Sequence, residues 1–257
     1  MPTRWIKLFL LLAHLATGLI ACILFLAFTA ARQQNGPLPS TIVCWWHKRL
    51  CRIFEINIVR HGAPHSGCAL YVANHISWID IPVLGRETAP CFVAKSELRE
   101  WPLIGWLASK TGTIFLRRGN GASAFKMTTE IRRLILDRRN VAIFPEGTTT
   151  DGKQVGLFHS APFAAVVDTD CWIQPICIRY PLPGGGHSPI APFIEEMSLA
   201  SHVWRLLGEH TVSVEVTFCP PVSCTGKNRQ ILSIESHTLI CNTLQVNRRS
   251  HKLTNRD

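Results

Sequence analysis

The sequence has few charged residues and no arrangement of cysteines that suits a metal ion. Charged residues make up 17% of the 257 positions, whereas hydrophobic residues make up 47%. None of the ten cysteines stands in a C-x-x-C pair, and none is grouped with histidine at zinc-ligand spacing. Most lie inside apolar stretches, which is typical of small buried thiols in a reducing compartment. We therefore expect no metal site and no bound cofactor.

Acidic residues are the scarcer of the two charge types. Asp and Glu total 17 against 27 for Lys and Arg, which leaves a net charge of +10. Such a balance suits nucleic acid, an anionic lipid surface or a phosphate-bearing small molecule. The basic residues are scattered in small clusters, and no nucleic-acid motif accompanies them. We therefore expect membrane lipid or a phosphate-bearing ligand as partner, and no nucleic acid.

Long hydrophobic runs are also few, because only residues 8–28 form one. His14 is the only residue in this run that could carry a charge. At about 1.5 Å per residue, a helix of this length covers roughly the hydrocarbon core of a bilayer. A cleaved signal peptide is the alternative, but its apolar region is usually only about 7–15 residues long. The sequence therefore predicts a retained membrane-anchoring helix.

A second N-terminal segment, residues 40–55, is amphipathic. Ser40 is a plausible helix N-cap, and apolar residues then recur at helical spacing on one side. Aromatic and basic residues together are typical of a helix that lies in the membrane interface, although a helix packed on a globular domain fits equally well. We expect residues 1–55 to form membrane-anchoring helices, 56–246 a globular domain and 247–257 a polar tail.

The globular part alternates strand-like and helical patterns. A helical pattern is clearest over residues 122–138, and the Pro- and Gly-rich segment 181–192 reads as a surface loop. This alternation predicts an α/β domain with a largely parallel central sheet flanked by helices, in which ligands bind at the carboxyl ends of strands. The apolar runs predicted as strands are 69–73, 91–94, 113–116, 141–144, 172–178 and 212–218.

The first candidate for chemistry is the segment from Asn74 to Asp80. His75 directly follows a predicted strand, and Asp80 would lie in the first turn of the next helix. If the chain folds His75 back, Asp80 can accept a hydrogen bond from one imidazole nitrogen and leave the other as a base. Ser77 lacks the G-x-S-x-G elbow of a serine hydrolase, so we expect it to cap that helix. Taken alone, the pair also fits a structural histidine.

Two further strand ends carry polar residues. Residues 112–116 would deliver Arg117 and Arg118 to a strand end, where a guanidinium suits phosphate, although both could also be solvated charges. Residues 141–150 end a strand in Pro-Glu-Gly and then hydroxyl residues. Gly147 can take a positive φ there and turn the backbone sharply, which would present polar groups to an anion. An ordinary strand-to-helix turn fits the same pattern.

Together and in this order, these segments resemble the glycerolipid acyltransferase family, and specifically the PlsC-type lysophosphatidic acid acyltransferases. A strand with a central proline and a Lys-x-Glu-Leu segment add to the resemblance, which covers about residues 56–220. The two N-terminal helices also resemble the membrane-docking motif of that family. The matching segments are Asn74–Asp80, Lys95–Leu98, Gly112–Arg118, Phe144–Thr148 and Ile173–Ile176.

The resemblance implies a role for each matching residue. His75 would be the general base and Asp80 would orient it. The acceptor would be lysophosphatidic acid, acylated to phosphatidic acid in phospholipid biosynthesis from acyl-CoA or acyl carrier protein. The enzyme would sit on the cytoplasmic (inner) membrane with its active site facing the cytoplasm. The residues implied to bind the acceptor, with Lys95 and Arg118 on its phosphate, are Lys95, Arg118, Glu146, Gly147 and Thr148.

Two departures from the family pattern leave the acceptor headgroup open. Thr149 stands where the family often has arginine, and His159 stands where it usually has lysine. Both changes remove permanent positive charge and resemble a bacterial branch that includes lyso-ornithine lipid acyltransferases. A lyso-ornithine lipid O-acyltransferase is therefore the alternative enzyme. A non-catalytic membrane-bound lipid-binding adaptor is the alternative of another class, but it leaves the co-occurring motifs unexplained.

Overall fold

The computed structural model describes residues 2–31, 38–101, 104–116, 121–194 and 197–254. Their centre is an eight-stranded sheet in the order β1-β7-β6-β2-β5-β3-β4, with β8 paired to β6. Strands β6, β2, β5, β3 and β4 are parallel, whereas β7 and β8 run antiparallel to β6. The predicted α/β fold with a largely parallel sheet is confirmed. The strands are β1 (Ile56–His61), β2 (Ala69–Ala73), β3 (Cys91–Lys95), β4 (Ile114–Leu116), β5 (Val141–Ile143), β6 (Trp172–Arg179), β7 (Val212–Phe218) and β8 (Val222–Ser223).

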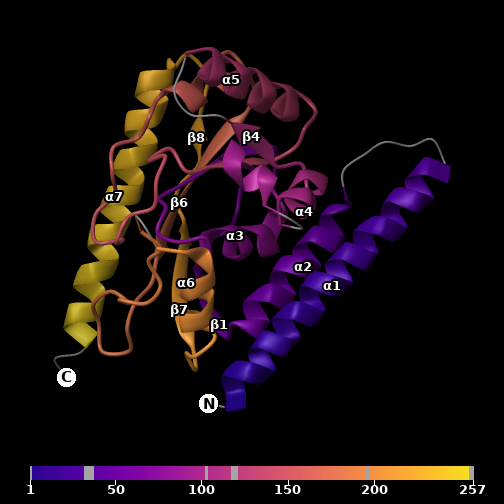
Figure 1. The fold of residues 1–257 in the computed structure, drawn as a ribbon. Coiled ribbons are helices and arrows are strands. Elements are labelled where there is room, and N and C mark those ends of the chain that lie inside the picture. Colours follow the sequence, from indigo (N-terminus) through magenta and orange to yellow (C-terminus); the bar gives the residue numbers. More distant parts are fainter. Residues whose placement is uncertain (1, 32–37, 102–103, 117–120, 195–196, 255–257) are drawn as a thin grey trace.

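Helices cover both faces of this sheet (Figure 1). Successive residues of β2 point to opposite faces, so Tyr71 packs in one core and Leu70 in the other. The Tyr71 core takes side chains from α2 (Ser40–Ile53), α3 (Asp80–Thr88) and α6 (Leu199–Leu206). The Leu70 core takes side chains from α5 (Gly121–Leu136) and α7 (Arg229–Thr254). The shorter helices are η1 (Ser96–Glu100), α4 (Ile104–Lys110) and η2 (Ala161–Ala165).

The N-terminal helices α1 (Pro2–Ala31) and α2 form a pair along one side of the domain (Figure 1). In the described part of the chain, α1 is the one helix that could cross a membrane by length and composition, over Thr3–Phe25. Its inner face is nevertheless docked on α2. The His14 ring stacks on the Trp46 ring at 3.7 Å between centroids.

Several local predictions differ from the structure. Ser40 is the first residue of α2 rather than its N-cap, which is Pro39 and makes no side-chain cap bond. The sequence pattern missed β1, which pairs with β7 and is mostly exposed, and the two-residue β8. Both are too short or too polar to stand out as buried strands. Helix α7 continues across residue 247, where the sequence pattern placed the start of a polar tail.

Candidate active site

Asn74 fixes the position at which the chain leaves the sheet before His75. The Asn74 amide donates to the Ile178 carbonyl at 2.9 Å and accepts from the Ile178 N–H at 2.8 Å. This side chain continues the parallel β2–β6 pairing one residue past the end of β2 at Ala73. His75 therefore emerges at the carboxyl edge of the sheet, where ligand sites of parallel sheets collect.

The His75 ring is held by Asp80, the first residue of α3. Its Nδ1 lies 2.8 Å from Asp80 Oδ2, and the same oxygen accepts the backbone N–H groups of Ile76 and Ser77 at 2.8 and 2.9 Å. The fully buried Asp80 side chain acts as acceptor for all of these donors. Nδ1 is therefore the protonated ring nitrogen, and Nε2 keeps its lone pair. Within the described residues, no hydrogen bond occupies Nε2, so it is available to a substrate proton.

Tyr180 adds a fourth hydrogen bond to Asp80. Its hydroxyl donates to Asp80 Oδ1 at 2.6 Å from the residue that directly follows β6. Burial raises the pKa of this hydroxyl, and the nearby Asp80 charge raises it further. Both carboxylate oxygens of Asp80 are thus occupied, which fixes the imidazole in one tautomer and one orientation. The sequence pattern gave no sign of Tyr180, because the contact joins residues 100 positions apart.

Ser77 does not cap α3 as the sequence suggested. Helix α3 begins at Asp80 with Ile79 at its N-cap position, and no side chain caps it. The Ser77 hydroxyl is buried without a hydrogen bond to any described residue. Asp80 instead accepts the N–H groups of Ile76 and Ser77, so these two hydrogen bonds order the loop before α3 and do not cap the helix.

Glu146 holds the backbone of His75 rather than its ring. Oε1 accepts the His75 N–H and Oε2 accepts the Gly156 N–H, both at 2.7 Å. The residue is 7% exposed, and burial raises the pKa of its carboxyl while these two N–H groups lower it. Glu146 thus joins the loop after β5 to His75 and to the segment around Gly156. Its two oxygens face the protein, which suits a loop clamp.

The residues after Glu146 bond the loop that follows β5 to the segments around it. Gly147 has φ 71°, which non-glycine residues rarely adopt, and its N–H donates to the Phe144 carbonyl at 3.0 Å. The Thr150 N–H donates to the His75 carbonyl at 2.8 Å, and the Thr149 hydroxyl donates to the Phe193 carbonyl. The side chain of Thr148 is exposed. Of the predicted acceptor residues on this loop, Thr148 is therefore the one that presents its side chain to solvent.

The predicted cations lie at neighbouring strand ends. Lys95 is the last residue of β3, is exposed, and pairs in register with Leu116, the last residue of β4. Arg118 lies outside the described residues. Because β2, β5, β3 and β4 are parallel, the edge that carries His75 and Glu146 also carries Lys95. The described residues contain no group of three or more His, Cys, Asp or Glu side chains arranged for a metal ion.

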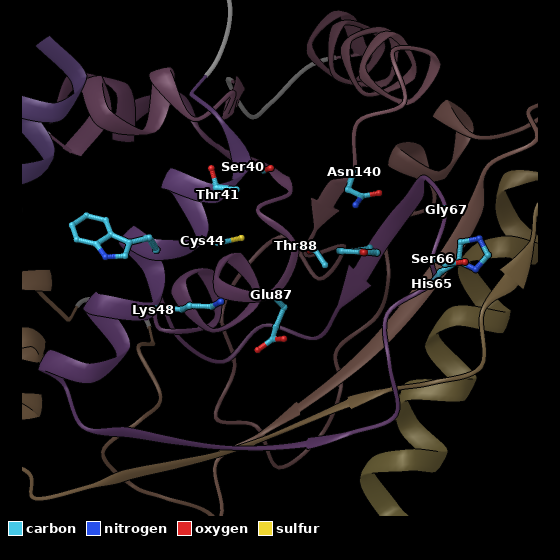
Figure 2. Close-up of a pocket in the computed structure, with 12 residues that line it drawn as sticks. Ser40, Thr41, Cys44, Lys48, His65, Ser66, Gly67, Glu87, Thr88 and Asn140 are labelled. Carbon is cyan, nitrogen blue, oxygen red and sulfur yellow. The ribbon is translucent and has the colours of Figure 1, made fainter. Parts of the chain in front are cut away.

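A cavity of about 670 Å³ lies away from this edge. Figure 2 shows it between Ser40 and Lys48 of α2, Glu87 near the end of α3, and the residues that precede β2 and β5. Those residues, such as Gly67 and Asn140, come before their strands and so lie at the amino edge of the sheet. None of the predicted site residues lines this cavity.

Comparisons with known proteins identify the relatives of this chain. A family model described as Acyltransferase matches residues 56–179. The lyso-ornithine lipid O-acyltransferase of Pseudomonas aeruginosa is 35% identical over 87% of this chain and 88% of that protein. The protein of the same name from Brucella abortus is 31% identical over 86% and 87%.

More distant relatives are named for another acceptor. The 1-acyl-sn-glycerol-3-phosphate acyltransferase of Neisseria gonorrhoeae is 25% identical over 69% of each chain. The crystal structure of PlsC, the 1-acyl-sn-glycerophosphate acyltransferase of Thermotoga maritima, superposes with a TM-score of 0.65. That match covers 94% of this chain and 96% of PlsC at 19% identity, and so shows a shared fold.

Proposed function

We propose that this chain, which belongs to the PlsC-type family of glycerolipid acyltransferases, uses His75 as the general base that deprotonates a lyso-lipid hydroxyl for acyl transfer. The observation that carries the proposal is the His75 ring, with Nδ1 bonded to a buried carboxylate and Nε2 open at the carboxyl edge. Family membership makes the chain an acyltransferase. The roles of single residues are inferred from their geometry.

The proposed reaction needs one base and an activated donor. Nε2 of His75 takes the proton of the acceptor hydroxyl, and the oxygen attacks the thioester carbonyl of acyl-CoA or acyl carrier protein. The tetrahedral intermediate collapses, the C–S bond breaks, and the departing thiolate takes the proton from the imidazolium. Asp80 stabilises the imidazolium between these steps. A thioester is already activated, so no protein nucleophile, metal or other cofactor is needed.

Lyso-ornithine lipid is the acceptor that we favour. The two departures from the family pattern leave no permanent cation at positions 149 and 159, and the Thr149 hydroxyl is already bonded to the Phe193 carbonyl. An ornithine headgroup carries an ammonium and a carboxylate, so it needs less positive charge than a phosphate does. Relatives with 35% and 31% identity are named for this acceptor, which supports the same assignment here.

Lysophosphatidic acid, the acceptor predicted from the sequence, is the second candidate. Lys95 is exposed at the end of β3 and makes no ion pair within the described residues, so it is open to an anionic headgroup. The Neisseria relative named for 1-acylglycerol-3-phosphate acylation supports this candidate, although at lower identity.

Direct competition between the two acceptors tests the proposal. Purified full-length protein in detergent would receive one acyl-CoA with equal amounts of lyso-ornithine lipid and lysophosphatidic acid. We expect ornithine lipid to be the main product, and the His75→Ala variant to form neither. Preferential formation of phosphatidic acid would reject the acceptor assignment alone. Full activity of His75→Ala would reject the proposed base.

We further propose that α1 lies within one leaflet of the membrane rather than across it. At about 1.5 Å per residue its 30 residues span about 45 Å. Near one end, Lys7 donates to Glu55 at 2.6 Å and to the Glu209 carbonyl at 2.7 Å, and the helix also packs against α4. A helix that is docked on a polar domain in this way cannot leave it to cross a bilayer. We place the protein on the cytoplasmic face of the inner membrane, where acyl donors are available.

A further inference from the structure

Trp204 is an exposed aromatic side chain outside the two N-terminal helices. It lies on α6 and remains 39% exposed. Its ring meets the ring of Trp5, which is 62% exposed, edge to face at 5.2 Å between centroids. The Arg4 guanidinium lies above the Trp204 ring, 5.0 Å from its centroid. Two tryptophans and an arginine therefore form one cluster where α6 meets the start of α1.

This cluster is continuous with the apolar outer face of α1. The contacts with Trp5 and Arg4 place Trp204 beside the N-terminal turns of that helix. Large hydrophobic side chains are exposed along nearly the whole of α1, far more than a soluble surface usually carries. They are Trp5, Ile6, Phe9, Leu10, Leu12, Leu19, Ile20, Ile23, Leu24 and Phe28.

We propose that Trp204 is a membrane anchor, so that α6 forms a third element of the bilayer-contacting face beside α1 and α2. The occupant of this face is the interfacial layer of a phospholipid bilayer. Tryptophan favours that layer because its ring is apolar and its indole N–H is polar. An arginine beside it adds attraction to anionic lipid headgroups. The inference rests on the membrane association in the proposed function, and it extends the contact beyond the N-terminal helices.

The opposite side of α6 supports the active-site segment. His202 is buried, and its Nδ1 accepts the Trp78 indole N–H at 2.9 Å. Its Nε2 lies 3.0 Å from the carbonyl oxygens of Ile190 and Pro192. The next residue, Phe193, donates its N–H to the Ile76 carbonyl at 2.9 Å. One short helix thus contacts lipid on one side and holds the chain next to His75 on the other, which sets the height of the site above the bilayer.

The test compares Trp204→Ala with Trp172→Ala. Trp172 is a close control because it is 37% exposed and also packs on an aromatic ring, that of His65 at 5.2 Å. It begins β6 at the amino edge of the sheet, and within the described residues its ring contact is to His65 rather than to α1. Purified full-length proteins would be mixed with vesicles of phosphatidylglycerol and phosphatidylethanolamine and separated by flotation. We expect Trp204→Ala to weaken partitioning about three- to tenfold and Trp172→Ala to leave it unchanged.

A measurement on the unsubstituted protein covers the case in which Trp204→Ala does not fold. Hydroxyl-radical oxidation of the protein in nanodiscs, read by mass spectrometry, reports both tryptophans in one sample. Their similar exposure makes their rates comparable, so we expect Trp204 to be oxidised several-fold more slowly than Trp172. Equal oxidation of the two, or equal flotation of the two folded variants, would overturn the proposal. Because neither readout involves acyl transfer, both can be repeated with His75→Ala, and their outcome is independent of the proposed reaction.

Discussion

His75 is held at two places by two different buried carboxylates. Asp80 holds the ring through Nδ1, and Glu146 holds the backbone N–H of the same residue. A general base must lie within hydrogen-bond reach of the proton that it removes. Displacement of either the ring or the backbone of His75 therefore lowers the rate of acyl transfer. The two acids therefore share the task of placing Nε2.

Removal of the Tyr180 hydroxyl should disturb the base without touching substrate. In Tyr180→Phe, Asp80 Oδ1 loses its one hydrogen bond among the described residues and stays buried. A hydrogen bond to a charged group contributes about 1.5–3 kcal/mol, so we expect kcat to fall roughly tenfold or more while the acceptor KM changes little. Steady-state kinetics at varied acceptor concentration would measure both.

Tyr71 provides the matched control for this substitution. It is the only other tyrosine and is also buried, and its hydroxyl lies beside Thr88 without a well-formed hydrogen bond to any described residue. Tyr71→Phe should therefore leave kcat unchanged. Equal losses in the two variants would show that Tyr180 acts through packing alone.

Glu146→Gln should lower kcat and also change how stability depends on pH. The glutamine amide would place a donor against one of the two backbone N–H groups, so we expect kcat to fall about ten- to a hundredfold. Burial raises the pKa of Glu146, so the folded chain binds this proton more tightly than the unfolded chain does. Burial of the ionised carboxylate therefore lowers the free energy of unfolding. This destabilisation is fully present at pH values above the pKa of Glu146 in the folded state and disappears as pH falls through that pKa.

Unfolding of wild type and Glu146→Gln in parallel, at several pH values, would test the direction of this pH dependence. The free energy of unfolding of wild type, relative to that of the variant, should rise as pH is lowered from about 7 to about 4.

Gly156→Ala supplies an independent disturbance, because a Cβ at this position would lie 2.8 Å from Glu146 Oε2. If Gly156→Ala keeps full kcat, the clamp does not position His75.

At the scale of elements, the packing of α1 against α2 fixes the position of the apolar helix α1. His14 and Gly18 stand one turn apart on the inner face of α1, and both pack against the Trp46 ring of α2. Lys7, on the same face, is buried and pairs with Glu55. The sequence predicted the apolar run, and the structure places its His14 in the contact with α2, whereas Lys7, just before the run, bonds to Glu55 and to the Glu209 carbonyl of the globular domain.

Gly18→Leu should separate this helix pair. A Cβ on Gly18 would overlap carbons of the Trp46 ring, so one of the two helices must move. Overpacking of this kind costs about 1–3 kcal/mol, which should lower Tm in detergent by several degrees. Ala16→Leu places the same side chain at an exposed position of α1 and should leave Tm unchanged. Equal Tm values for the two variants would argue against close packing of α1 on α2.

At the scale of the whole molecule, the docked path of α1 predicts that both termini lie on one side of the membrane. Its N-terminal turns contact Trp204 and Glu209 of the globular domain, so they cannot lie across the bilayer from it. Epitope tags at the two ends should both be cleaved by protease added to inside-out membrane vesicles. Protection of the N-terminal tag alone would mean that α1 spans the bilayer.

The sequence by itself determined the class of fold and the place of the proposed base. Buried parallel strands read as continuous apolar runs, and a histidine just after such a run must emerge at the carboxyl edge, so the edge of the sheet with His75 and Asp80 was predictable. These features depend on local pattern and short separations along the chain. The matches of β2 and β7 to their predicted ranges have the same origin.

Only the tertiary structure decided which distant groups meet His75 and where α1 lies. Tyr180 reaches Asp80 because β6 is the neighbour of β2, and Glu146 reaches the His75 N–H because β5 lies on the other side. Strand order depends on how the whole sheet buries its two faces, which no local pattern contains. The direction of α1 likewise follows from its docking on α2 and on Glu55, since an apolar helix of this length could cross a bilayer or lie within one leaflet.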